Sequence, residues 1–143
     1  MKLLKICIIV VISLLVLTGC NQKNNDINMI GDELLMKINI NNVEYIVKLD
    51  NNETTQELLK LLPIEFDMNE LNGNEKYQSL PKKLPTNAYI PDLINQGDVM
   101  LYGSDTLVIF YSSFSTRYSY TKIGHIDNLP DLGSENVHVI ISK

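Results

Sequence analysis

A single arginine, Arg117, lies within a run of hydroxyl side chains. Residues 112–121 read SSFSTRYSYT, and eight of these ten residues carry a hydroxyl group. A guanidinium beside hydroxyls binds a carboxylate or a phosphate through its planar set of N–H donors. If a strand runs through Arg117, alternation places Ser115 on the same side and Tyr118 on the opposite side. Arg117 and Ser115 are therefore candidate ligand-binding residues; the alternative is a solvated hairpin in which Arg117 pairs with a surface acid.

Two asparagines and a glutamate crowd a second short segment. Asn72 and Asn74 flank Gly73, and Glu75 follows directly. Asn-Gly is foremost a turn-forming pair, because glycine adopts a positive φ without steric penalty. The alternative is that Asn72, Asn74 and Glu75 form the polar rim of a ligand cleft.

Aromatic residues that border loops are candidates for the apolar wall of such a cleft. Most of the tyrosines and phenylalanines are expected in the core, because aromatic side chains bury a large apolar area. Tyr89 and Tyr102 each border an expected loop rather than the middle of a strand. We therefore expect these two tyrosines to line a groove.

Other kinds of catalytic site find little support in the sequence. His125 and His138 fall on different expected strands, with no third ligand at a recognised metal-site spacing. The sequence contains neither a G-x-S-x-G nucleophile motif nor a phosphate-binding loop. We predict no catalytic residue, no metal and no cofactor.

The charge balance excludes one class of partner. The chain has 143 residues with 12 basic and 17 acidic side chains, for a net charge of −5. A surface that binds nucleic acid must be basic to neutralise phosphates, so we expect no nucleic-acid partner. The length fits one domain, and two cysteines are too few for a disulfide scaffold.

The first twenty residues have the layout of a secretory signal. Lys2 and Lys5 precede an apolar run over residues 6–17, which is shorter than the ~20 residues that a membrane-spanning helix needs. The following Leu17-Thr18-Gly19-Cys20 resembles the lipobox of bacterial lipoproteins. That resemblance implies cleavage of residues 1–19 and attachment of a diacylglycerol to the Cys20 thiol. The alternative is an ordinary cleaved signal with an incidental cysteine.

Residues 20–35 are polar and rich in asparagine, which predicts a linker between the lipidated Cys20 and a folded domain over residues 36–143. Loss of Lys2 and Lys5 would leave ten basic against 17 acidic residues, so the mature chain would carry a net charge of −7. We expect the protein on the extracytoplasmic face of the cell membrane, its membrane partner, held there by the lipid on Cys20. The sequence identifies no protein partner.

Alternating and apolar segments predict a mainly β domain. Residues 36–40 and 44–49 alternate and are joined by Asn41-Asn42, which indicates a hairpin. The proline-rich residues 80–97 are expected to form a long irregular connection. About eight short strands favour a closed, mostly antiparallel barrel. The other expected strands are residues 64–69, 98–102, 107–111, 118–126 and 137–141.

One clear helix is expected near the start of this domain. Residues 53–62 carry leucines at helical spacing, and Pro63 ends the pattern. Asn51, Asn52 and Thr54 are the candidate capping residues.

Four segments of the domain resemble the small bacterial cyclophilin-like domains. The resemblance spans about residues 36–143 and implies a cyclophilin-type eight-stranded barrel with a peptide cleft. The segments are FDMNELNGNEKY at 66–77, LPTN at 84–87, GDVMLYGSDTLVIFY at 97–111 and SFSTRYSYTKIGHID at 113–127.

The resemblance also bears on activity. True cyclophilins carry an F-H-R type strand, whose arginine points at the prolyl nitrogen, and a tryptophan. Residues 64–71 read IEFDMNEL, and the chain has no tryptophan. Prolyl isomerisation has a barrier of about 20 kcal/mol, which a donor lowers by weakening amide resonance. We therefore expect a binding module for a peptide or a small anionic ligand; the alternatives are a weak peptidyl-prolyl isomerase acting on exported proteins and a structural subunit beside a larger partner.

Overall fold

The computed structural model describes residues 29–30 and 33–143. The expected signal peptide, Cys20 and most of the expected linker lie outside the described residues. In the described part of the chain, no helix is both long enough and apolar enough to cross a membrane.

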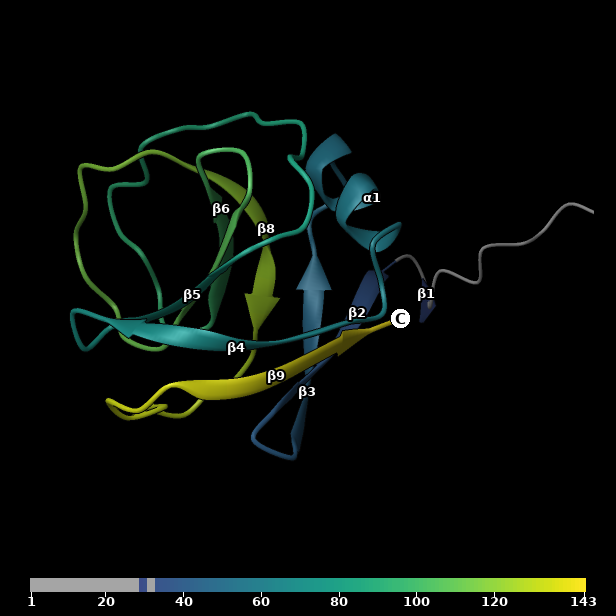
Figure 1. The fold of residues 1–143 in the computed structure, drawn as a ribbon. Coiled ribbons are helices and arrows are strands. Elements are labelled where there is room, and N and C mark those ends of the chain that lie inside the picture. Colours follow the sequence, from purple (N-terminus) through teal and green to yellow (C-terminus); the bar gives the residue numbers. More distant parts are fainter. Residues whose placement is uncertain (1–28, 31–32) are drawn as a thin grey trace, which may run out of the picture.

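The described residues form nine strands and one helix (Figure 1). They are β1 (Met29–Ile30), β2 (Glu33–Ile40), β3 (Val43–Leu49), α1 (Glu53–Leu59), β4 (Ile64–Leu71), β5 (Glu75–Ser79), β6 (Asp98–Tyr102), β7 (Thr106–Phe110), β8 (Tyr120–Ile126) and β9 (Val137–Ser142).

Eight of these strands close into an antiparallel barrel. The order around the barrel is β2-β3-β8-β6-β7-β5-β4-β9, and pairing of β9 with β2 closes it. The two-residue β1 adds to β2. The prediction of a mainly β, closed barrel of about eight strands with one helix is confirmed.

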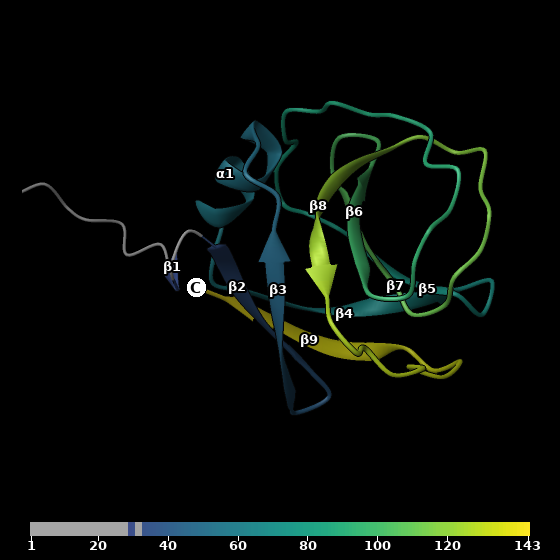
Figure 2. The same ribbon diagram turned by 180° about the vertical axis from the view of Figure 1, so that it is seen from behind.

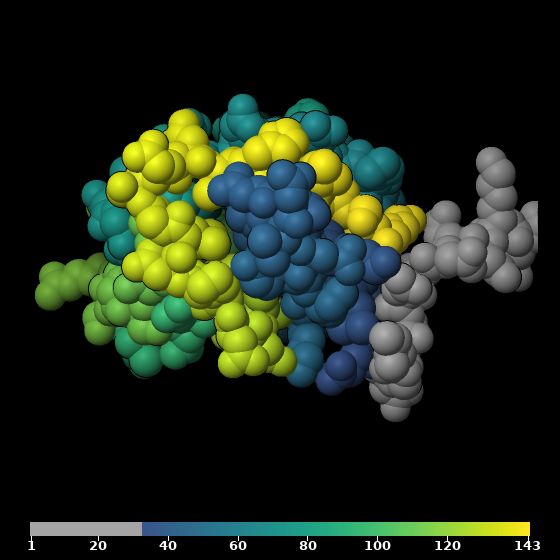
Figure 3. Space-filling view, turned by 90° about the horizontal axis from the view of Figure 1, so that it is seen from below, coloured from purple at the N-terminus to yellow at the C-terminus, as the bar shows by residue number. Residues whose placement is uncertain are grey.

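The expected hairpin between β2 and β3 is present. Its turn residues Asn41 and Asn42 have φ values of 49° and 68°, which fits a two-residue turn in which both central residues are left-handed. Strand β2 begins at Glu33, three residues before the start that the alternation indicated. Figure 3 shows the blue hairpin against yellow β9, where the His138 backbone N–H donates to Asn41 Oδ1 over 2.9 Å.

Helix α1 lies at one end of the barrel and begins at the predicted cap (Figure 1). Asn52 is the N-cap, and its Oδ1 accepts from the Thr55 backbone N–H over 2.9 Å. The helix ends at Leu59 rather than at position 62, because residues next to Pro63 are disfavoured in the helical region. Leu58 and Leu59 pack into the barrel core.

Strands β6 and β7 bury both of their faces. They are almost entirely buried, as their continuous apolar runs predicted. One face belongs to the barrel interior, and the other carries a second apolar cluster that includes Met100, Val108 and Phe110. The connections 80–97 and 111–119 run outside these strands, and Ile94 pairs with Phe114 between them (Figure 2).

Strand β5 is absent from the sequence-based predictions. Its residues, EKYQS, are polar, yet β5 pairs with β4 on one side and β7 on the other. Lys76 lies at the position where an apolar residue would have revealed the alternation, and its side chain is fully buried. Because this buried residue is a lysine, the hydropathy pattern of residues 75–79 does not indicate a strand.

Candidate functional site

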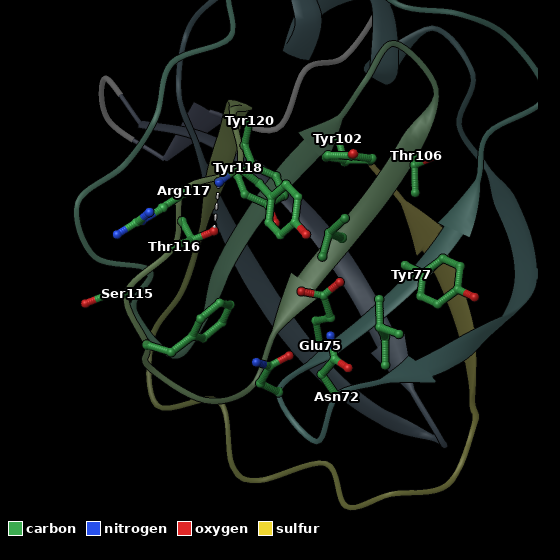
Figure 4. A pocket seen from close by; sticks show the side chains of 14 residues that line it. Asn72, Glu75, Tyr77, Tyr102, Thr106, Ser115, Thr116, Arg117, Tyr118 and Tyr120 are labelled. Atoms are coloured by element: carbon green, nitrogen blue, oxygen red, sulfur yellow. Dashed lines mark hydrogen bonds between the residues drawn. The ribbon is translucent and has the colours of Figure 1, made fainter.

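A pocket of about 860 Å³ lies on the outer face of strands β5 to β8, above the second apolar cluster (Figure 4). The turn between β4 and β5 forms one edge, and the connection that leads into β8 forms another. The 14 lining residues are Leu71, Asn72, Asn74, Glu75, Tyr77, Tyr102, Thr106, Val108, Phe114, Ser115, Thr116, Arg117, Tyr118 and Tyr120.

Strand pairing makes the floor of this pocket continuous. Tyr77 of β5 is opposite Val108 of β7, while Tyr102 of β6 is opposite both Thr106 of β7 and Tyr120 of β8. Because side chains alternate along a strand, these partners point to the same face of the sheet. The four strands β5, β6, β7 and β8 therefore present one surface.

Three tyrosines form one wall of the pocket. The Tyr102 ring lies 6.3 Å from the Tyr118 ring and 5.7 Å from the Tyr120 ring, measured between ring centroids. The Tyr102 and Tyr118 rings are almost perpendicular, at 88°. Tyr120 is buried and contacts Phe110 edge-on, whereas Tyr118 is 65% exposed. Tyr120 is therefore the buried part of this wall, and Tyr118 is the part that a ligand can reach.

Glu75 supplies the acidic group of the pocket. Figure 4 shows its carboxylate near the middle of the lining side chains. Burial raises the pKa of Glu75, and the negative charge of Glu70 raises it further. Burial also raises the pKa of Tyr120, with the charge of Glu75 as the next cause. Among the residues that the structure describes, the Glu75 carboxylate forms neither an ion pair nor a side-chain hydrogen bond.

Asn74, next to Glu75, carries an unusual buried oxygen. Its side-chain Oδ1 is inaccessible to solvent and has no hydrogen-bond partner within the described part of the chain. A buried acceptor left unpaired costs about 1–3 kcal/mol. The backbone around it is well fixed, because the Tyr111 N–H donates to the Asn74 carbonyl over 3.0 Å.

A buried ionic network on the other side of β5 fixes this strand. The Lys76 ammonium donates to Glu70, to the Gly133 carbonyl over 2.6 Å and to the Glu135 carbonyl over 2.7 Å. The Tyr111 hydroxyl donates to Glu70 over 2.8 Å, and the Lys76 ammonium lies 4.7 Å from the Tyr111 ring centre. Because Lys76 and Glu75 are adjacent in β5, anchoring one sets the direction of the other.

The same network perturbs the titration of its members. Burial raises the pKa of Tyr111 to about 12, helped by the hydrogen bond to Glu70. Burial alone would raise the pKa of Glu70, but the hydrogen bonds from Lys76, Tyr111 and the Gly73 N–H lower it overall. The turn that carries Asn72 and Asn74 is thus tied to an ionised Glu70.

Six of the seven candidate ligand-binding residues line this one pocket. Tyr89 is the exception: it is 45% exposed and pairs through its backbone with Tyr120, outside the lining set. The others are Asn72, Asn74, Glu75, Tyr102, Ser115 and Arg117. Their role in ligand binding stays a prediction.

The segment around Arg117 differs from the expected strand. Strand β8 begins at Tyr120 rather than at position 118, so Arg117 lies in a loop. The Thr116 hydroxyl accepts from the Tyr118 backbone N–H over 3.1 Å, a local turn that replaces strand pairing (Figure 4). Ser115 and Arg117 are exposed and point outward at the rim, while Phe114 is half-buried.

Several lining residues escaped the sequence-based prediction. Tyr77 was missed because β5 was missed. Thr106 and Val108 were missed because nothing in the sequence indicated which face of β7 lines the pocket. Tyr118 was assigned to the side opposite Arg117, yet both line the pocket. The available signal was the clustering of tyrosines at positions 118 and 120, close to Arg117 in the chain.

The two histidines lie on β8 and β9, away from the pocket. His125 Nδ1 is 3.0 Å from Asp98, and His138 Nδ1 is 2.8 Å from Asp67. No group of three or more His, Cys, Asp or Glu side chains in residues 33–143 is placed to hold a metal ion. The lining residues likewise offer no histidine or cysteine ligand.

Comparisons with known proteins agree with the barrel. The model of a cyclophilin-like family matches residues 38–142. The solution structure of the hypothetical protein AF2241 from Archaeoglobus fulgidus is similar to this chain, with a TM-score of 0.54 and 20% sequence identity. That similarity covers 78% of this chain and 95% of the archaeal one, and at this identity it shows the fold alone. No curated protein matches the chain.

Proposed function

Because the chain belongs to the cyclophilin-like family, whose model covers residues 38–142, we propose that its barrel binds a peptide or a small ligand without chemical turnover. The observation that carries this proposal is the pocket itself, with its tyrosine wall and with polar groups that have no partner among the residues that the structure describes. Pockets of 300–1,000 Å³ that combine aromatic walls with a few polar groups are typical ligand sites.

We expect no turnover because of the residues in β4. Leu71 is the one residue of β4 that lines the pocket, and the strand contains neither arginine nor histidine. A strand with these residue types offers no cationic donor for a prolyl nitrogen. Strand β4 therefore lacks the cationic donor that a cyclophilin-type isomerase is expected to use.

A weak prolyl isomerase is the second candidate, and Arg117 is the observation in its favour. Its guanidinium lies at the rim of the pocket and could approach a bound peptide. The test is the cis/trans relaxation of a proline peptide in the presence of the full chain. We expect the spontaneous rate. Acceleration that disappears in Arg117→Ala would establish the isomerase instead.

Ligand binding is tested by two-dimensional amide NMR of the full chain against peptide and metabolite mixtures. We expect saturable shifts at pocket residues such as Tyr102 and Tyr118. A screen in which no compound produces saturable shifts there would contradict the binding module.

We also propose that the protein is a membrane-anchored lipoprotein on the extracytoplasmic face. The support is the sequence Leu17-Thr18-Gly19-Cys20 after a charged and apolar leader. Two acyl chains suffice for stable anchoring. Mass spectrometry and membrane fractionation should find a lipid on the wild-type chain and none on Cys20→Ala. Equal masses, apart from the substitution, with both proteins released into the medium would contradict the anchor.

A further inference from the structure

We propose that the part of the pocket around Glu75 is a subsite for a cationic group, which is an ammonium or a guanidinium. A small amine, or a lysine or arginine side chain of a peptide, would carry this group. The proposal rests on the binding function above and names the chemistry that the pocket selects. It departs from the anionic ligand that Arg117 suggested from the sequence.

The Glu75 carboxylate is the first group in the pocket that would bind a cation. Its carboxylate lies in the middle of the pocket without an ion pair among the residues that the structure describes. A half-buried carboxylate has lost part of its hydration, and a nearby positive charge restores the stability of its ionised form. The raised pKa of Glu75 is consistent with this uncompensated position.

The two cations closest to Glu75 among the described residues do not fill this role. Lys76 follows Glu75 directly, but it faces the opposite side of β5, where Glu70 and two backbone carbonyls take all three of its donors. Arg117 lies at the rim, and its side chain points away from Glu75 (Figure 4). Within the described part of the chain Glu75 has no compensating positive charge, and we expect a ligand to supply it.

Asn74 adds a second acceptor beside Glu75. Its Oδ1 is buried and unpaired within the described residues, so it lacks a hydrogen-bond donor. Ammonium and guanidinium groups carry several N–H donors and no acceptor. A ligand cation would satisfy the Glu75 carboxylate, and a rotation of the Asn74 side chain on its fixed backbone would bring the Asn74 oxygen to the same cation.

The tyrosine wall suits the same charge. The faces of aromatic rings attract cations within about 6 Å of the ring centre. Tyr102 and Tyr118 meet at 88°, so they form a corner that offers ring surface in two directions. Tyr118 is 65% exposed, so its ring is accessible to an entering ligand. An anion would instead meet the negative face of each ring and the Glu75 carboxylate.

The test is an amide NMR titration of the full chain with matched probes. One pair is the peptide acetyl-Gly-Lys-Gly-amide and its neutral counterpart with norleucine, and a third probe is n-butylamine. We expect the lysine peptide to bind at least about tenfold more tightly than the norleucine peptide, since one charge-assisted contact separates them. Comparison of the peptide with n-butylamine shows whether the cation is best carried on a peptide or on a free amine.

Two variants and one control connect the effect to the pocket. Glu75→Gln should weaken the lysine peptide about tenfold and leave the norleucine peptide unchanged. Tyr118→Leu, at a position that is 65% exposed, should weaken it about two- to fivefold. Glu44→Gln changes an exposed glutamate of β3 outside the pocket and should have no effect.

The outcomes separate this inference from the binding function. If neutral and cationic peptides bind the pocket equally and Glu75→Gln changes neither, the cation subsite is wrong while the binding module stands. If no probe or screened compound shifts the pocket residues, both are wrong.

Discussion

Adjacent residues of β5 have opposite electrostatic roles. Lys76 is fully buried, and its charge is compensated by Glu70 and two carbonyls on one side of the strand. Glu75 faces the other side and has no such compensation among the described residues. Burying an ion is tolerated only when it is paired and hydrogen-bonded. The buried charge of Lys76, which stabilises the fold, is therefore paired. The charge of Glu75, which faces the pocket, is unpaired among the described residues.

The pairing of Glu70 with Lys76 predicts a large loss of stability in Glu70→Gln. The variant leaves the Lys76 ammonium buried without its counter-charge, and removing one partner of a buried pair costs about 3 kcal/mol. Urea unfolding measures this cost, with Glu44→Gln as the control at an exposed glutamate. A loss below about 1 kcal/mol would mean that water or another group compensates Lys76.

Glu70 also makes the wild type sensitive to acid. Its pKa is lower in the folded state than the usual 4.5. Its stabilising contribution is therefore present above the unfolded pKa and is lost as the pH falls through the folded value. The difference in unfolding free energy between wild type and Glu70→Gln should shrink over that acidic range. A difference that stays constant down to the folded pKa would contradict this assignment.

His138 predicts the opposite pH dependence. The hydrogen bond with Asp67, and then the charges of Asp67 and Glu65, raise its pKa above 6.5. A raised folded pKa contributes stability that is fully present below the unfolded value and is lost as the pH rises through the folded value. The melting temperature of wild type should exceed that of His138→Asn more at pH 5.5 than at pH 8.5. Equal differences at the two pH values would show that the imidazolium adds nothing.

At the scale of elements, the predicted segments were those with a simple hydropathy pattern. The β2–β3 hairpin shows alternation, α1 helical spacing, and β6 and β7 continuous apolar runs, so all of them carry such a pattern. Strand β5 does not, because Lys76 occupies a buried position through tertiary partners 57 and 59 residues away. The loop around Arg117 has strand-like residues but forms a local turn instead, because the Thr116 hydroxyl takes up the Tyr118 N–H.

Helix α1 depends on one of its candidate caps. Asn52 accepts from Thr55 and also donates to the Lys122 carbonyl of β8 over 2.9 Å, so it joins the helix to the barrel. We expect Asn52→Ala to lose about 1–2 kcal/mol of unfolding free energy. Asn51→Ala is the matched control, because the Asn51 side chain makes an exposed hydrogen bond to Gln56 only. Equal losses in the two variants would contradict the capping assignment.

On the scale of the whole molecule, barrel closure brings the pocket together. Strand β5 lies between β4 and β7, which places Glu75 opposite Phe110 and Tyr77 opposite Val108, in a strand some 30 residues later in the chain. The sequence predicted a closed barrel and six residues that line the pocket. It could not predict their common location, because that depends on a strand order that no local pattern encodes.

The barrel and the pocket on its outer face carry the proposed function. The cyclophilin-like barrel is established over residues 38–142. The proposed use of its outer face, as a ligand site without turnover, depends on whether this pocket is the place of binding. Thr106 of β7 lines the pocket and is only half-buried, so a tryptophan there would take up part of the pocket and leave the barrel core intact.

The most direct test is the dissociation constant of the tightest ligand found by screening the full chain, measured for wild type and for Thr106→Trp. We expect saturable binding to wild type and a loss of at least about tenfold in the variant, at an unchanged melting temperature. An unchanged dissociation constant in a folded Thr106→Trp protein would overturn the proposed site, and so would a wild-type chain that no peptide or small molecule saturates.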